Sequence, residues 1–186
     1  MRLILLGAPG SGKGTQGQRL AERFEVPHIA SGDLLRAEVR AQTEFGRRVV
    51  GYLDSGQLAP DELVSELVLP VVLAAAQAGG YVLDGFPRSV TQAVKAEGVV
   101  AEAGAGPQHV IYLAVPEQVL VQRLLERAGA AGRSDDTLEV ITDRLRVFEA
   151  ATRPLVDHYR ARGLLREVAA QVPADEVTRA IVATLE

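Results

Sequence analysis

Gly7-Ala8-Pro9-Gly10-Ser11-Gly12-Lys13-Gly14-Thr15 is the stretch that decides the fold of this chain of 186 residues. It follows the apolar run 3–6 and precedes a helix-like segment at 16–24, which predicts the order strand, glycine loop, helix. In such a loop, backbone N–H groups and the helix N-terminus converge on phosphate oxygens. Gly14 takes the position directly after the lysine, where a hydroxyl residue is usual, and Thr15 supplies a hydroxyl one residue later. The stretch therefore predicts a phosphate-binding loop.

The choice of lysine inside the loop supports this prediction. Among the 20 Lys and Arg residues only Lys13 and Lys95 are lysines, so lysine stands here against a strong preference for arginine. A compact ammonium on a flexible stem reaches between β- and γ-phosphates in a tight loop, whereas a planar guanidinium is bulkier. A flexible glycine turn without a ligand is the alternative, and the flanking strand and helix argue against it.

The composition limits the classes of protein to which the chain can belong. Its length suits one substantial core, and 47% hydrophobic with 24% charged residues indicates a soluble globular domain without a membrane span. The chain has no cysteine, which excludes disulfides, thiolate zinc sites and thiol catalysis. We therefore expect a cytoplasmic protein without structural zinc. A net charge of −4 argues against a general nucleic-acid binder.

Short β-rich runs alternate with helical patterns, which is typical of a parallel α/β sheet. The predicted strands are 3–6, 26–29, 81–83, 110–115 and 164–168. Helices are predicted at 16–24, at 61–77 with a kink at Pro70, and at 116–127, followed by a small-residue connector at 128–132. A last long helix is predicted from a cap at Ser134 to beyond Tyr159, with a bend at Pro154. The stretch 31–59, with a helix cap at Ser31-Gly32-Asp33, is interpreted as an insert.

Asp84 comes directly after the predicted strand 81–83, at the sheet edge where the glycine loop also lies if the sheet is parallel. Magnesium keeps several waters and takes one or two carboxylates. Asp84 is therefore predicted to hold a phosphate-bound Mg²⁺ through a water, with Thr15 nearby. A turn aspartate before Gly85 is the alternative.

Arg88 and Gln92 lie one helical turn apart, on one face if Ser89 opens a helix. Arginine offers phosphate a bidentate fork, and glutamine offers a base edge both a donor and an acceptor, which is what reading adenine requires. Four further arginines frame the connector, namely Arg123, Arg127, Arg133 and Arg144. They are predicted to form a lid that brings positive charge onto a transferring phosphoryl group, the alternative being solvated helix faces.

Four motifs occur in order: GAPGSGKGT at 7–15, SGDLLR at 31–36, DGFPRSVTQ at 84–92 and the arginine series at 123–144. With them the chain closely resembles the adenylate kinase family over nearly its whole length. The resemblance implies a P-loop α/β fold with a five-stranded parallel sheet flanked by helices. It divides the chain into a core at 1–29, 60–125 and 137–186, an AMP-binding insert at 30–59 and a short lid at 126–136. It also implies a monomer that catalyses MgATP + AMP ⇌ 2 ADP.

The resemblance further implies roles for individual residues. On the ATP side these are Gly10, Ser11, Gly12, Lys13, Gly14, Thr15, Arg123, Arg127 and, through its backbone, Val172. On the AMP side they are Ser31, Arg36, Gln57, Leu58, Ala59, Gly85, Phe86, Pro87, Arg88, Gln92, Arg133 and Arg144. The expected catalytic cations are Lys13, Arg88, Arg127, Arg133 and Arg144. The chain departs from the family pattern at Ala169-Ala170, where Asp-Gly is usual, and in a short lid without zinc-binding cysteines.

Other functions remain open at this point. A kinase of the same fold that acts on UMP or CMP is disfavoured, because pyrimidine-specific relatives usually carry asparagines where this chain has Ser89 and Gln92. A nucleotide-dependent switch would not need the set Arg36, Arg88 and Gln92, and the guanine-reading Asn-Lys-x-Asp motif is absent from the sequence. If the protein had a purely structural role, the aligned cations of the four motifs would have no explanation.

Overall fold

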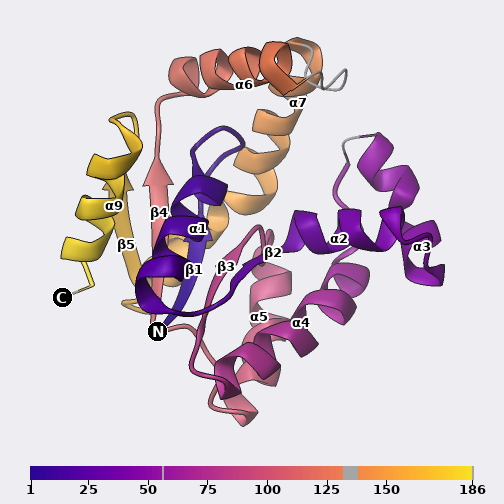
Figure 1. Ribbon diagram of the computed structural model, residues 1–186, viewed down its shortest axis with the longest axis vertical. Coiled ribbons are helices and arrows are strands. Elements are labelled where there is room, and N and C mark those ends of the chain that lie inside the picture. Colours follow the sequence, from indigo (N-terminus) through magenta and orange to yellow (C-terminus); the bar gives the residue numbers. More distant parts are fainter. Residues whose placement is uncertain (56, 132–137, 186) are drawn as a thin grey trace.

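The computed structural model of the chain describes residues 1–55, 57–131 and 138–185, with the backbone alone for 127–131. Within this part, five strands form one parallel sheet in the order β2-β3-β1-β4-β5 (Figure 1). The strands are β1 (Arg2–Leu6), β2 (His28–Ala30), β3 (Tyr81–Asp84), β4 (His109–Ala114) and β5 (Leu165–Ala169). The predicted α/β class and five-stranded parallel sheet are confirmed.

Helices connect the strands and lie around the sheet. They are α1 (Lys13–Phe24), α2 (Ser31–Arg40), α3 (Glu44–Asp54), α4 (Asp61–Gln77), α5 (Val90–Glu102), α6 (Glu117–Ala131), α7 (Leu138–Val147), α8 (Pro154–Ala161) and α9 (Ala174–Ala183). Two of them, α2 and α3, lie within the stretch 31–59 and project to the side of the sheet (Figure 1). Pro70 lies inside α4, whose predicted bounds are confirmed, and the kink there stays a prediction.

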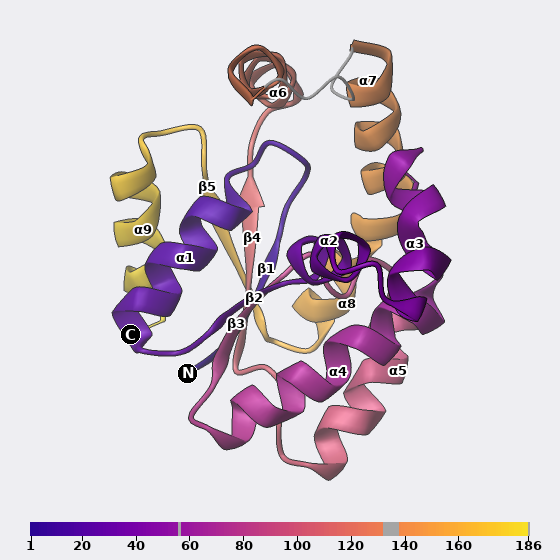
Figure 2. The ribbon, with the colours of Figure 1, turned by 45° about the vertical axis from the view of Figure 1, so that its right-hand side comes forward.

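The two faces of the sheet carry separate apolar clusters because successive side chains of a strand point in opposite directions. Leu3 and Leu5 of β1 pack with residues of α1 and α9, whereas Ile4 and Leu6 pack with residues of α4, α5 and α8. Figure 2 shows these two helix layers on opposite sides of the sheet. With both faces covered, the strands can be almost wholly apolar, which is why short runs such as 3–6 were recognisable in the sequence.

The second strand begins at His28, two residues later than predicted. The preceding helix is responsible, because Glu25 adopts the left-handed conformation with φ 53° and ends α1. The N–H of Val26 then donates to the carbonyl of Ala21 at 3.0 Å. Val26 is therefore part of the helix terminus and is not available to the sheet.

The segment expected to form one long helix with a bend at Pro154 is helical from Leu138 to Ala161, but it is not one regular α-helix. The helix α7 ends at Val147, and a π-helical turn covers Phe148–Thr152 before α8 begins. Pro154 has no N–H, so the regular hydrogen-bond ladder cannot continue through it. Instead the N–H of Arg153 donates to the carbonyl of Phe148, five residues back, at 2.9 Å. The predicted cap at Ser134 lies outside the described residues.

Two smaller predictions are also wrong. The connector expected at 128–132 is helical as far as Ala131, since α6 continues to that residue and alanine is the best helix former. The predicted cap at Ser31 is not formed, because the N-cap of α2 is Ala30 and makes no side-chain hydrogen bond. Ser31 is instead fully buried, and its hydroxyl donates to the carbonyl of Gly85 at 2.7 Å.

Candidate functional site

A cleft of about 970 Å³ opens at the carboxyl ends of the central strands. Most of the residues predicted from the sequence line it, namely Gly10, Gly12, Lys13, Gly14, Thr15, Arg36, Gln57, Leu58, Ala59, Asp84, Gly85, Pro87, Arg88, Gln92, Arg123 and Arg144. Ser11, Ser31 and Phe86 are buried among the residues that support it. Val172 is 37% exposed and lies outside this cleft. Arg133 and the side chain of Arg127 lie outside the described part of the chain.

The glycine loop joins β1 to α1 and forms one wall of the cleft. Gly12 is the N-cap of α1 in the left-handed conformation and makes no side-chain cap, so the N-terminal N–H groups of the helix receive no acceptor from it. The ammonium of Lys13 folds back over the loop and donates to the carbonyl oxygens of Gly7 and Ala8 at 2.8 and 3.1 Å. A helix N-terminus and an ammonium thus share one concave surface, which suits phosphate oxygens.

The interior of this loop is closely packed. A Cβ atom built on Gly7 would lie 2.6 Å from the hydroxyl oxygen of Ser11, so only glycine fits there. The Ser11 hydroxyl is buried and finds no hydrogen-bond partner among the described residues. Ser11 therefore supports the loop from within.

Strand pairing brings Asp84 to the glycine loop. Leu5 of β1 pairs with Asp84 of β3, which places the carboxylate beside the start of the loop. Asp84 and the exposed Thr15 both line the cleft. One carboxylate and one hydroxyl with room for water are a donor set that suits Mg²⁺ bound to a nucleotide. These residues fit the predicted metal, although no group of three His, Cys, Asp or Glu side chains that could hold a metal ion occurs in the described chain.

A second wall is built around the carbonyl oxygen of Gly85. It accepts hydrogen bonds from the Ser31 hydroxyl and from Nε of Arg88, both at 2.7 Å. Burial lowers the pKa of Arg88, with Arg36 acting in the same direction and Asp84 opposing it. The guanidinium is thus held in one position in the cleft, partly desolvated, where an anion would gain most from it.

Gln92 lies directly beside Arg88 and is only 1% exposed. Ser89 is the N-cap of α5, as predicted, and its hydroxyl accepts from the backbone N–H of Gln92 at 3.1 Å. The amide oxygen of Gln92 accepts from the backbone N–H of Arg88 at 2.6 Å. Its amide nitrogen donates to Asp61 at 3.2 Å. The predicted pair Arg88 and Gln92 does face one cleft, and its geometry is held by backbone and side-chain contacts.

Three residues of the site were missed in the sequence. Asp61 was recognised only as a first-turn helix residue, and its contact with Gln92 could not be foreseen from either segment. Thr152 belongs to the π-helical turn, and its hydroxyl donates to the carbonyl of Arg88 at 2.9 Å. Arg40 lines the cleft one turn beyond Arg36 on the same helix, a spacing that could have revealed it.

The remaining cations approach from three helices. Arg36 of α2 forms an ion pair with Asp33 on the same helix and stays 46% exposed. Arg123 of α6 and Arg144 of α7 also line the cleft. With Lys13 and Arg88 they surround the cleft with positive charge, although the chain as a whole is acidic.

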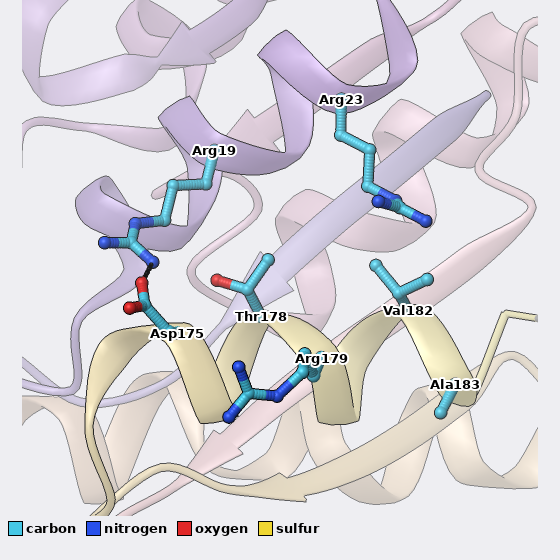
Figure 3. Close-up of a pocket in the computed structure, with 7 residues that line it drawn as sticks. All are labelled: Arg19, Arg23, Asp175, Thr178, Arg179, Val182 and Ala183. Carbon is cyan, nitrogen blue, oxygen red and sulfur yellow. Dashed lines mark hydrogen bonds and ion pairs between the residues drawn. The ribbon is translucent and has the colours of Figure 1, made fainter.

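A second hollow, of about 310 Å³, lies between α1 and α9 and contains none of the predicted nucleotide residues. Figure 3 shows Arg19 of α1 and Asp175 of α9 pointing toward each other across it, joined by an ion pair. Beneath this surface, buried Gln16 donates to the carbonyl of Ala174 at 2.9 Å and accepts from the Thr178 hydroxyl at 2.7 Å. These contacts fasten the phosphate-loop helix to α9.

Comparison with known proteins agrees with this geometry. The family model described as adenylate kinase matches residues 5–164. A protein named adenylate kinase 1 from Nostoc sp. (strain PCC 7120) is 45% identical over 99% of this chain and 98% of its own length. An adenylate kinase from Stenotrophomonas maltophilia (strain K279a) is 41% identical over 100% of both chains. One from Synechococcus sp. (strain JA-2-3B'a(2-13)) is 45% identical over 100% of this chain and 96% of its own length. No helix in the described residues is long and apolar enough to cross a membrane.

Proposed function

This chain belongs to the adenylate kinase family, and on that premise we propose that its cleft binds two nucleotides side by side. The chain is a phosphotransferase that moves the γ-phosphoryl group of MgATP to AMP, reversibly, giving two ADP. The observation that carries this assignment is that one cleft contains both the glycine loop with Lys13 and the separate group of Arg36, Arg88 and Gln92. A protein that bound a single nucleotide would need only the glycine loop with Lys13.

The glycine loop is proposed as the donor half of the site. Backbone N–H groups from Gly10 to Thr15 would receive the phosphates of ATP, with the Lys13 ammonium leaving its carbonyl partners to contact them. A Mg²⁺ ion bound with ATP would supply neutralisation of the phosphate charge. Thr15 and, through water, Asp84 would hold it. Arg123 and the backbone of Val172 are proposed to contact the ATP base, an assignment that rests on the family resemblance.

The acceptor half is proposed to lie between α2 and the turn after β3. Arg88 and Arg36 would bind the AMP phosphate, and Gln92 the base. Ser31 and Gly85 hold Arg88 in position, while residues 57–59 close the pocket through their backbone atoms. The segments 30–59 and 126–136 remain proposals as AMP-binding insert and lid.

Catalysis on this arrangement needs no general base, because the attacking phosphate oxygen of AMP is already an anion. The obstacle is the mutual repulsion of two highly charged nucleotides, and the arginines and Lys13 remove it while holding the reacting groups in line. Arg127, Arg133 and Arg144 are proposed to complete this shell over the transferring phosphoryl group. A cytoplasmic location and a monomeric state, without nucleic-acid or membrane partners, stay predictions from the sequence.

A coupled assay with MgATP and each of AMP, CMP, UMP and GMP tests the proposal. We expect AMP to be phosphorylated far faster than the other three. Preference for CMP or UMP would favour the pyrimidine kinase, and nucleotide binding without any phosphorylated acceptor would favour a switch protein.

Arg88→Ala separates catalysis from stability. Because Arg88 is proposed to contact the transferring group, we expect turnover to fall by about 100-fold or more, while the free energy of unfolding falls by no more than about 1.5–3 kcal/mol, the contribution of its hydrogen bond to Gly85. Arg23→Ala, an arginine of α1 outside the cleft, is the matched control and should retain full activity. Wild-type turnover in Arg88→Ala would contradict the assignment of this residue.

A further inference from the structure

The side-chain amide of Gln92 is held in a single orientation by two contacts of opposite kind. Its oxygen accepts from the backbone N–H of Arg88 at 2.6 Å. Its nitrogen donates to Oδ1 of Asp61 at 3.2 Å. A backbone N–H can only donate and an ionised carboxylate can only accept, so the oxygen and nitrogen of the amide cannot exchange places without losing both hydrogen bonds.

The Asp61 carboxylate is itself fixed. Its second oxygen, Oδ2, accepts from the Ser89 hydroxyl at 2.8 Å. That hydroxyl in turn accepts from the backbone N–H of Gln92 at 3.1 Å. Asp61 begins α4 and Ser89 caps α5, so the ring of contacts ties two helix N-termini together around the Gln92 amide. The amide orientation is thus built into the core of the site before any ligand arrives.

These two contacts leave one N–H and one oxygen lone pair of the amide for a ligand, and Gln92 lines the cleft. A base edge that complements them must present a donor opposite the amide oxygen and an acceptor opposite the amide nitrogen. Adenine does so with its exocyclic amino group and N1. Hypoxanthine and guanine present the reverse, a carbonyl oxygen at position 6 beside an N1–H.

A 6-oxopurine could be matched only if the Gln92 amide turned over. Its NH₂ would then face the N–H of Arg88, and its carbonyl oxygen would face the Asp61 carboxylate. Both contacts are repulsive, and leaving buried polar groups so opposed is costly. The Asp61 carboxylate therefore disfavours binding of a 6-oxopurine as well as favouring binding of adenine.

We infer that Asp61 is a positioning residue that sets the base specificity of the acceptor site, selecting a 6-aminopurine monophosphate over 6-oxopurine monophosphates through the orientation of Gln92. This inference rests on the proposed function in one respect, that Gln92 contacts the base of the acceptor nucleotide. Asp61 touches no substrate and acts only through Gln92.

Asp61→Asn is the sharpest test, because it keeps the shape of the side chain. The asparagine can still accept from Gln92 through its oxygen, with its NH₂ group donating to the Ser89 hydroxyl oxygen in place of the present contact, so kcat/KM for AMP should change by less than about threefold. It can also turn and donate, which removes one of the two repulsions against the flipped amide. We therefore expect the ratio of kcat/KM for AMP to that for IMP to fall about tenfold, mainly through a gain with IMP.

Three controls accompany this variant. Glu62→Gln removes the neighbouring carboxylate of the same helical turn, which pairs with Lys95 at the surface, and should leave the ratio unchanged. In a Gln92→Ala background, Asp61→Asn should no longer alter the ratio, because the side chain through which it acts is gone. Urea unfolding of each variant checks that the fold is retained. Asp61→Ala is a second test substitution, and it should also lower the ratio of kcat/KM for AMP to that for IMP.

The dissociation constants of AMP and IMP, measured by calorimetry without ATP, distinguish this inference from the proposed function. If the wild-type protein fails to phosphorylate AMP, the proposed function is wrong, and the ratio of the two dissociation constants still tests the role of Asp61. An unchanged AMP to IMP ratio in Asp61→Asn overturns the inference. An equal decrease in kcat/KM for AMP and for IMP also overturns it, because a residue with a purely structural role would affect both substrates alike.

Discussion

Gly85→Ala probes the centre of the acceptor half of the site. Gly85 has φ 78°, where alanine costs about 1–2 kcal/mol. A Cβ atom there would lie 2.7 Å from the Ser31 hydroxyl and 3.3 Å from Nη2 of Arg88, so both side chains must move. Both also donate to the Gly85 carbonyl, and a hydrogen bond from a charged donor contributes about 1.5–3 kcal/mol. We expect a loss of unfolding free energy of about 3 kcal/mol, within a factor of two.

The displacement of the Ser31 and Arg88 side chains should also reduce kcat/KM, for AMP much more than for ATP. A shift of about 1 Å in a group that positions a reactant costs about 100-fold in rate, so kcat/KM for AMP should fall by about that factor. The KM for ATP should change little, because the glycine loop is formed by a separate part of the chain. Urea unfolding and steady-state kinetics with each nucleotide varied in turn measure the two effects.

Gly98→Ala is the matched control for this prediction. Gly98 lies inside α5, and a Cβ atom there meets nothing within 4 Å. Alanine should therefore stabilise the protein by about 0.5–1 kcal/mol and leave both KM values unchanged. Retention of wild-type stability and wild-type kcat/KM for AMP in Gly85→Ala would refute the assigned role of the Gly85 carbonyl and its two donors.

Three further changes test other parts of the structure. Gln16→Ala should lower the free energy of unfolding in urea by about 1–3 kcal/mol, because it removes the buried amide that joins α1 to α9. Thr152→Val should reduce kcat/KM for AMP about fivefold, because the carbonyl of Arg88 loses its hydroxyl donor, whereas a larger effect on ATP would contradict this placement. Burial raises the pKa of Tyr81 to about 12 from 10.0, so its contribution to stability is complete below pH 10 and is lost as the pH rises to about 12. Over that interval the unfolding free energy of the wild-type protein should fall by about 2–3 kcal/mol more than that of Tyr81→Phe.

Local patterns were sufficient for most of the elements and for the glycine loop between β1 and α1. The apolar run before Gly7, the glycines and Lys13 lie within one short segment, so strand, loop and helix are specified by neighbouring residues. The same holds for Ser89, whose hydroxyl caps the helix that follows it. Boundaries were predicted less accurately, as at Val26, because a helix terminus and a strand start compete for the same backbone groups.

The sequence by itself predicted a phosphate-binding loop, the placement of Arg88 and Gln92 in one cleft, and a parallel sheet, since each follows from residue type and short spacing. Only the tertiary structure decided that Asp61 orients Gln92 and that Thr152 supports Arg88. These contacts join segments far apart in the chain, and they depend on how α4 packs against α5 and on where the hydrogen-bond ladder breaks before Pro154. No local sequence pattern predicts these contacts, because they are set by the packing of whole elements against the sheet.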